Sequence, residues 1–225
     1  MAQAGIHALL GSVLRGKVMK RELLLLGVIL GNLVPDLDNL AVAVATLTGR
    51  ETEGLHRTFS HSFLSVAAIV VLFYVVGQAA KKSAWSNLGL GLGIGMSMHI
   101  LVDLLVWFDG VEIFWPLTSW VNLWEGVTPP QWWSNLMMPA EFLFMAIFML
   151  LLGSWAQKTQ TDLGYLPKLR LWTVILVGLF VVFTALVYTL ESGFMIPYGA
   201  LYLLALGLVI GVTIRMRQTI QRLAG

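Results

Sequence analysis

The chain contains no cysteine among its 225 residues. This absence excludes disulfides, thiolate nucleophiles and cysteine-ligated zinc or iron–sulfur sites, so any metal must be held by His, Asp, Glu or backbone oxygen. Charged residues are also scarce, at 12% of the chain, whereas a soluble domain carries about 25%. The formal net charge is +2 and the basic residues form no stripe, so we expect no nucleic-acid partner.

Hydrophobic residues make up 58% of the chain and form long runs. A bilayer core of about 30 Å needs roughly 20 apolar residues per helix. The sequence therefore predicts an all-α, polytopic membrane protein with one transmembrane helical domain over residues 1–225. We place about six transmembrane helices near residues 22–46, 60–79, 87–107, 136–153, 171–190 and 195–214. Residues 2–14 are too short to cross, and we expect a half-helix or interfacial helix followed by a tight turn at 15–20.

The basic residues predict the orientation of the chain, because cytoplasmic loops are enriched in Lys and Arg. Most of them lie in the segments 15–21, 81–82, 158–170 and 215–222. The connection 108–135 has no Lys or Arg, which favours both termini in the cytoplasm. Arg50 and Arg57 are the exceptions on the outer side, and Arg57 lies within a histidine motif, where chemistry rather than topology explains it.

Tryptophan is concentrated in the connection 107–133, which holds six of the nine in the chain. Amphipathic indole rings gather at membrane–water interfaces, so one interpretation is an interfacial belt. The other is a lid that grips a lipid or a substrate. The sequence leaves both open.

Ionisable side chains within the spans are rare, and such groups are costly in a membrane and usually functional. The set contains every histidine of the chain: His7, Asp36, Asp38, His56, His61, His99, Asp103 and Glu141. His99 and Asp103 are four residues apart and so project from one helix face. Pro35 breaks the first span just before Asp36, which is tolerated at this depth only where backbone is buried in protein or lines a cavity. Counting along the spans places the set other than His7 in the outer half of the membrane. His7 reaches a similar level if its short helix rises from the cytoplasmic side as a hairpin with the first span.

Each of these residues has a purely structural explanation when taken alone. Asp36, Asp38 and Ser60 are suited to capping helices, and a single histidine in a bundle is often a packing group. Uncompensated carboxylates at this depth would cost about 3 kcal/mol each, however, and a divalent cation offsets that cost for several at once. Mixed imidazole and carboxylate donors suit zinc first, then manganese or iron. The donors outnumber those of one tetrahedral ion, so we expect one or two ions.

Four motifs carry a resemblance to a known family. His7 in a short N-terminal helix, PDLD at 35–38, HRTFSHS at 56–62 and HILVD at 99–103 resemble the LexA-binding, inner-membrane-associated hydrolases, a family of YdjM-like metal-dependent hydrolases. The resemblance covers about residues 1–120, with Glu141 as a further candidate. It implies a bacterial inner-membrane location, metal-dependent hydrolysis, and metal ligands at the seven His and Asp positions above. Family members often carry a histidine after PDxD, where this chain has Asn39. The ligand order is also similar to that of zinc-dependent phospholipase C enzymes.

The leading hypothesis is a membrane-embedded hydrolase that cleaves an ester or phosphodiester of a lipid or lipid-linked substrate through metal-activated water. Asp38 or Asp103 would act as general base, and the guanidinium of Arg57 would steady a phosphate. The metal-site half is residues 1–145, and residues 146–225 carry no motif. The alternative is a divalent metal ion or proton transporter using the same residues. A membrane protein in which the metal only stabilises the fold is the third possibility, and a serine nucleophile at Ser60 or Ser62 lacks a supporting pattern.

Overall fold

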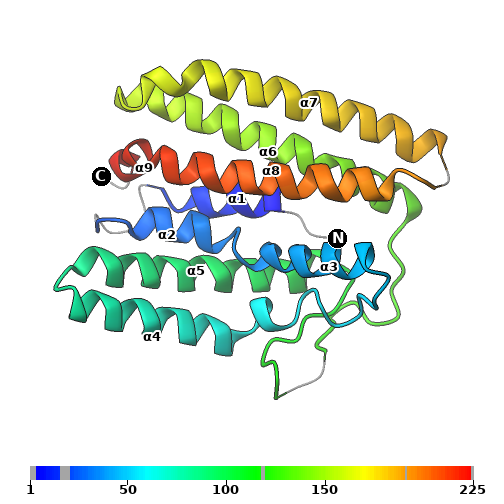
Figure 1. Cartoon of the computed structure of the whole chain (residues 1–225), viewed down its shortest axis with the longest axis horizontal. Helices are drawn as coiled ribbons and strands as arrows, with labels where there is room; N and C mark the ends of the chain where they lie inside the picture. The colour runs from blue at the N-terminus through cyan, green and yellow to red at the C-terminus, as the bar shows by residue number, and fades with distance from the viewer. Residues whose placement is uncertain (1–3, 16–20, 118–119, 191, 224–225) are drawn as a thin grey trace.

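The computed structural model describes residues 4–15, 21–117, 120–190 and 192–223 (Figure 1). These residues form nine α-helices, three short 3-10 helices and a single isolated bridge between Val111 and Val121. The helices are α1 Ala4–Val13, α2 Leu24–Gly31, α3 Asn39–Leu47, α4 Phe63–Ala79, α5 Ser83–Val106, α6 Gln131–Thr159, α7 Leu166–Thr189, α8 Met195–Arg215 and α9 Arg217–Leu223. The 3-10 helices are η1 Pro35–Asp38, η2 Phe59–His61 and η3 Leu163–Tyr165. The prediction of an all-α membrane protein is confirmed.

The predicted spans correspond to helices of different length. Four segments are long and apolar enough to cross a bilayer, namely α5, α6, the η3–α7 segment and α8. The first predicted span is broken: α2 and the segment Pro35–Leu47 meet at an angle of 43° and together make a fifth candidate. The second is α4, an apolar helix of 17 residues that measures about 26 Å at 1.5 Å per residue. The count of about six spans is therefore roughly right.

The helices lie side by side, and α1 is enclosed among them (Figure 1). Contacts run from α4 to α5, α2, α1, α6 and α7 in turn, while α8 contacts α6, α2 and α3. The predicted short N-terminal helix is thus α1, packed between α2 and α6. The predicted turn at 15–20 lies outside the described residues except for Arg15.

A pair of glycines on each helix sets the distance between α2 and α5. Gly27 and Gly31 on α2 face Gly91 and Gly95 on α5, and both pairs are four residues apart. A Cβ atom at Gly31 would collide with the Leu92 carbonyl oxygen. Small residues at this spacing let membrane helices approach until their backbones touch. This close approach fixes the position, relative to α2, of the residues that follow Gly95 on α5.

Candidate metal centre

The break between α2 and α3 creates the first part of the site. Pro35 has no backbone N–H and cannot continue the hydrogen bonding of a helix, so α2 ends at Gly31 and η1 begins at Pro35. The Asn32 carbonyl oxygen accepts a hydrogen bond from His99 Nδ1 at 2.8 Å. Because a carbonyl can only accept, this bond fixes the proton of His99 on Nδ1 and leaves the lone pair of a neutral ring on Nε2. Orientation of a ligand histidine by a backbone carbonyl is typical of metal sites.

Helix α5 supplies the second part. Gly91, Gly95, His99 and Asp103 follow one another at intervals of four residues, so they share one face of α5. The two glycines hold that face against the backbone of α2. The next two turns therefore carry His99 and Asp103 to the break, where both are almost completely buried.

Seven of the eight predicted ligands meet in three linked groups. The groups are His7–His99–Asp103, Asp36–His61–His99 and Asp38–His56–His61, and within each the donor atoms lie within 4.8 Å of one another. Neighbouring groups share one residue, first His99 and then His61. The sequence-based expectation that short, distant motifs converge is met for these seven.

The shared residues lie close together at the centre. The Nε2 atoms of His61 and His99 are 3.0 Å apart, and His61 Nε2 is 3.4 Å from Asp103 Oδ2. His7 reaches the same carboxylate from α1, with Nε2 3.1 Å from Asp103 Oδ1, and its ring stacks on His99 at 3.6 Å between centroids.

The donor set fits a divalent cation. Both carboxylate oxygens of Asp36 are buried and have no hydrogen-bond partner among the described residues. His99 Nε2 lies 3.8 Å from Asp36 Oδ1. A buried carboxylate without donors is costly, and a cation held between Asp36, His61 and His99 would satisfy it.

The outer edge of the site is built around Asp38. Its Oδ1 accepts from His56 Nδ1 at 2.8 Å, and its Oδ2 accepts from the Ser60 hydroxyl at 2.8 Å and from the Arg57 backbone N–H at 3.1 Å. His56 is the most exposed member of the cluster, with 21% of its side chain accessible. The cluster therefore opens to the outside at His56 and Asp38.

His61 lies in η2, before the apolar helix α4. Its buried ring lies between two carboxylates, with Nδ1 3.2 Å from Asp38 Oδ2 and Nε2 3.4 Å from Asp103 Oδ2. This excess of carboxylate around the ring is an arrangement that attracts a cation.

Arg57 reaches the cluster with its side chain buried. Its Nε lies 3.2 Å from Asp103 Oδ2 and its Nη1 lies 3.3 Å from Asp109 Oδ2. The residue adopts φ +62°, a left-handed conformation that is uncommon outside glycine. This backbone turn lets one residue bond Asp38 through its N–H and Asp103 through its guanidinium.

Residues 1–186 match the family described as YdjM inner membrane protein. The chain belongs to this family. Neither the curated proteins nor the solved structures that were compared contain a match to it. As a member of the YdjM inner membrane protein family with several apolar spans, the chain is a multi-pass inner-membrane protein.

Glu141, the eighth predicted ligand of this YdjM-family chain, belongs to none of the three groups. Its Oε1 accepts a hydrogen bond from the backbone N–H of Gly5 at 2.7 Å, in the first turn of α1. The first N–H groups of a helix have no partner inside it, and a carboxylate there also complements the helix dipole. Glu141 therefore docks the buried end of α1, two residues before His7.

Replacing Glu141 tests this assignment. Glu141→Gln keeps an oxygen for Gly5 N–H, and we expect metal content unchanged and stability nearly so. Glu141→Leu leaves the buried N–H unpaired, and we expect a loss of about 1–3 kcal/mol in unfolding free energy. Thermal unfolding in detergent and metal analysis of the purified variants measure both effects. A large loss of metal in Glu141→Gln with normal folding would instead make Glu141 a ligand.

The tryptophan-rich connection is attached to the histidine motif of the YdjM-family chain. Phe63 N–H donates to the Ile113 carbonyl at 2.8 Å, Glu112 N–H to the Arg57 carbonyl at 2.9 Å, and the Ser62 hydroxyl to the Trp115 carbonyl at 3.1 Å. Four of the six indoles are nonetheless exposed: Trp115, Trp120, Trp124 and Trp132. The connection thus supports η2 from outside while presenting aromatic rings outward, as an interfacial belt does.

The two serines of the motif have different roles, which gives a matched pair of variants. The Ser60 hydroxyl bonds Asp38 and lies 2.9 Å from His61 Nδ1, whereas Ser62 is the N-cap of α4 and accepts from Leu64 N–H. We expect Ser60→Ala to weaken metal binding about 10- to 100-fold, the usual effect of losing a group that orients ligands. Ser62→Ala should leave the affinity unchanged and lower stability by about 1 kcal/mol. Titration against a chelator and thermal unfolding measure the two quantities, and equal affinities in the two variants would contradict the assignment.

Sequence reasoning missed three contributions to the site. They are the Asn32 carbonyl, the docking of α1 by Glu141, and the glycine pairs of α2 and α5. Only the last left a signal in the sequence, because Gly91 and Gly95 continue the four-residue spacing of His99 and Asp103 toward the N-terminus.

Proposed function

We propose that this YdjM-family protein is a membrane-embedded metal-dependent hydrolase. Its substrate is an ester or phosphodiester of a lipid or lipid-linked molecule. The observation that carries the proposal is the linked set of seven His and Asp donors, five of them buried and oriented by a backbone carbonyl and by serine. Among the described residues, the set is exposed at the edge formed by His56 and Asp38. The resemblance of the four sequence motifs to those of metal-dependent hydrolases supports the proposal independently of the geometry.

The ligands indicate the metal and its chemistry. Four imidazoles and three carboxylates suit zinc, with manganese or iron as substitutes, and two of the three groups would hold one ion each. A divalent cation in such a site lowers the pKa of bound water and polarises a carbonyl or phosphoryl oxygen. His61 and His99, which are shared between groups, link the positions.

The residues at the open edge are placed to handle protons. Asp38 and His56 form a hydrogen-bonded carboxylate–imidazole pair at 2.8 Å, at the only part of the cluster that is appreciably exposed among the described residues. Asp38 is thus better placed than the buried Asp103 to take a proton from water and pass it outward through His56. Arg57, paired with Asp103 and Asp109, holds Asp103 toward the histidines and adds positive charge where a phosphate would dock.

A lipid-type substrate follows from the surroundings. Phe59 and Leu37 are exposed on the two segments that carry the open edge, and the exposed tryptophans belong to the connection beside it. A water-soluble substrate would have to approach across these apolar side chains. A lipid headgroup arrives in the interface with its chains already in the bilayer.

The test is purification of the full chain with metal analysis, followed by a screen of defined lipids for hydrolysis. Wild-type protein is compared with His61→Ala and Asp103→Ala. We expect bound zinc, manganese or iron and metal-dependent turnover of at least one lipid class in wild type only. A well-folded wild-type protein that binds no transition metal would contradict the proposal.

A transporter is the second candidate, and the broken span favours it. Transporters place ion sites at discontinuous helices, as at the 43° bend between α2 and Pro35–Leu47. Transport also needs a polar path on the far side of the site, and there the α2–α5 interface is made of glycine and leucine. Uptake of zinc or manganese into proteoliposomes discriminates the two: uptake without hydrolysis favours transport. Bound metal with neither activity favours a structural role.

A further inference from the structure

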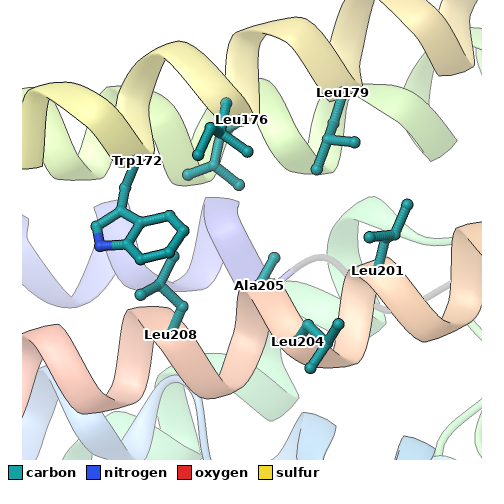
Figure 2. Close-up of a pocket in the computed structure, with 8 residues that line it drawn as sticks. Trp172, Leu176, Leu179, Leu201, Leu204, Ala205 and Leu208 are labelled. Atoms are coloured by element: carbon teal, nitrogen blue, oxygen red, sulfur yellow. The ribbon is translucent and has the colours of Figure 1, made fainter.

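An apolar cavity lies between α7 and α8, apart from the metal centre (Figure 2). It has a volume of about 400 Å³, within the range of small-molecule sites. Its lining residues come from 172–179 of α7 and 201–208 of α8, and none of them belongs to a ligand group of the metal centre. Figure 2 shows Trp172, Leu176 and Leu179 pointing from α7 toward α8. We call this space the α7–α8 cavity.

The cavity lies in the middle part of two long apolar spans. These spans are Leu163–Thr189 and Met195–Arg215, and each lining segment stays at least six residues, or about 9 Å, from both ends of its span. Two of the lining residues are exposed, Ile175 at 40% and Leu204 at 70%, so the cavity opens on the outer surface of the helix pair. The middle of a helix that crosses a bilayer lies in the hydrocarbon core. Lipid chains therefore surround this opening.

Two cations lie at one end of the same helix pair. Lys168 is in the first turn of α7 and Arg215 is the last residue of α8. Lys168 Nζ and Arg215 Cζ lie 5.5 Å and 5.6 Å from the centre of the Tyr165 ring. Arg215 Nη1 is 3.3 Å from Asp162 Oδ1, and the other oxygen of Asp162 accepts two hydrogen bonds from Thr219. Lys168 has no ion-pair partner among the described residues, so the one carboxylate does not balance the two cations.

The chain around these two cations is basic as a whole. Residues 155–171 and 211–223 contain one acid, Asp162, and six basic residues, which are Lys158, Lys168, Arg170, Arg215, Arg217 and Arg222. Basic residues beside a membrane span attract anionic lipid headgroups. The charge at this end of α7 and α8 is therefore complementary to a phospholipid with a net negative charge.

Trp172 connects the cations to the cavity. It follows Lys168 by one turn on the same face of α7, about 6 Å along the axis, and it lines the end of the cavity nearest to Lys168. On α8, Leu208 lines the cavity and lies two turns before Arg215 on the same face. Amphipathic indole rings prefer the boundary between headgroups and hydrocarbon. Cations, indole and apolar cavity thus follow one another in the order of the headgroup, the boundary and the chain of a lipid.

From this arrangement we infer that the α7–α8 cavity binds one acyl chain of an anionic phospholipid, whose phosphate lies at Lys168 and Arg215. The headgroup is then at the end of the spans and the chain points toward the bilayer centre, as in the bilayer itself. The apolar cavity provides affinity in proportion to the methylenes covered, and the cations provide the preference for negative charge. The site is separate from the proposed hydrolysis, and a lipid held there joins α7 to α8.

The experiment uses the full chain in phosphatidylcholine vesicles with a trace of a photoreactive lipid. The probe is phosphatidylglycerol or phosphatidylcholine with a diazirine in one acyl chain, present in both leaflets, and the labelled positions are mapped by mass spectrometry. In the wild type, phosphatidylglycerol should label residues 172–179 and 201–208 at least about five-fold more than phosphatidylcholine does. This is the preference for negative charge expected from one basic residue at a membrane surface.

Lys168→Gln tests the headgroup contact. It removes one cation without breaking an ion pair, so the phosphatidylglycerol label in the cavity should fall about five-fold while the phosphatidylcholine label stays the same. Arg170→Gln is the matched control, since Arg170 is also exposed on α7 but lies two residues further on and projects from a different face. It should leave both labels unchanged. An equal decrease in the two variants would show a general effect of surface charge and would overturn the inference.

Ala205→Phe tests the position of the chain. Ala205 lines the cavity, and the added ring should reduce the label about ten-fold, the loss expected when about two methylenes are excluded from an apolar site. Leu201→Trp serves the same purpose if Ala205→Phe does not fold. Gly207→Phe is the control, because Gly207 is on the same helix, has open space for a Cβ and does not line the cavity. Equal labelling by the two lipids in the wild type, labelling unaffected by the filling variants, or cross-linking of Leu204→Cys to a second copy overturns the inference.

Discussion

His61→Ala is expected to remove nearly all bound metal and all metal-dependent hydrolysis. His61 belongs to two of the three ligand groups, and its Nε2 also lies near Asp103 and His99. Loss of a group that merely orients ligands costs about 10- to 100-fold in affinity, so loss of a shared ligand should exceed about 100-fold. His56→Ala removes one member of the outermost group only and should leave the inner groups able to bind. Metal content per chain, measured on purified protein, should therefore fall in part for His56→Ala and almost completely for His61→Ala.

The control for this series is Phe59→Ala. Phe59 belongs to the same 3-10 helix as His61, but its side chain is exposed and it is not a donor. We expect wild-type metal content in Phe59→Ala, with unfolding temperatures in excess chelator similar for all three variants. Equal metal loss in His56→Ala and His61→Ala would argue against linked sites and for a single ion. Full metal content in His61→Ala would contradict the site itself.

The convergence of the seven candidate ligands was predictable because each motif is local and because its position along a span gives its depth in the membrane. Counting residues along a span gives the height of a side chain, and the high cost of intramembrane charge makes each Asp and His informative. Pro35 likewise marks the break directly, since proline cannot continue the hydrogen bonding of a helix. These inferences do not depend on knowing which helices pack against one another.

The contributions that sequence reasoning missed depend on tertiary contacts. The sequence predicts Glu141 as a metal ligand, and nothing in the sequence around it indicates that the first turn of α1 lies beside its carboxylate. The left-handed conformation of Arg57 is similar, because the motif alone does not indicate that the fold directs its guanidinium to Asp103 and Asp109. A cavity between α3 and α8 is lined by segments about 150 residues apart in the chain, from 39–47 and from 195–203. Such features become visible only once the helices are packed.

Gly95→Ala is expected to impair the metal centre although residue 95 touches no ligand. A Cβ at Gly95 would collide with the Val28 carbonyl oxygen and would lie 2.8 Å from the Gly31 Cα, and neither backbone atom can move without displacing α2. Overpacking of this kind costs about 1–3 kcal/mol. Any separation of α5 from α2 also lengthens the bond between His99 Nδ1 and the Asn32 carbonyl, which is already 2.8 Å. We therefore expect a lower unfolding temperature together with weaker metal binding, by about 10- to 100-fold, as for loss of an orienting group.

The comparison that isolates this effect is Gly178→Ala on α7, where a Cβ would meet nothing within 4 Å. The same substitution there should stabilise the helix by about 0.5–1 kcal/mol, because glycine is the more flexible residue, and should leave metal binding untouched. Chelator competition and thermal unfolding on the two variants separate the general effect of Gly→Ala from the effect of the contact. If Gly95→Ala loses stability but keeps its metal affinity, the ligands are held by η1 and η2 alone. If it loses both, the glycine contact between α2 and α5 is part of the metal site, since it sets the distance across which His99 reaches Asn32 and Asp36.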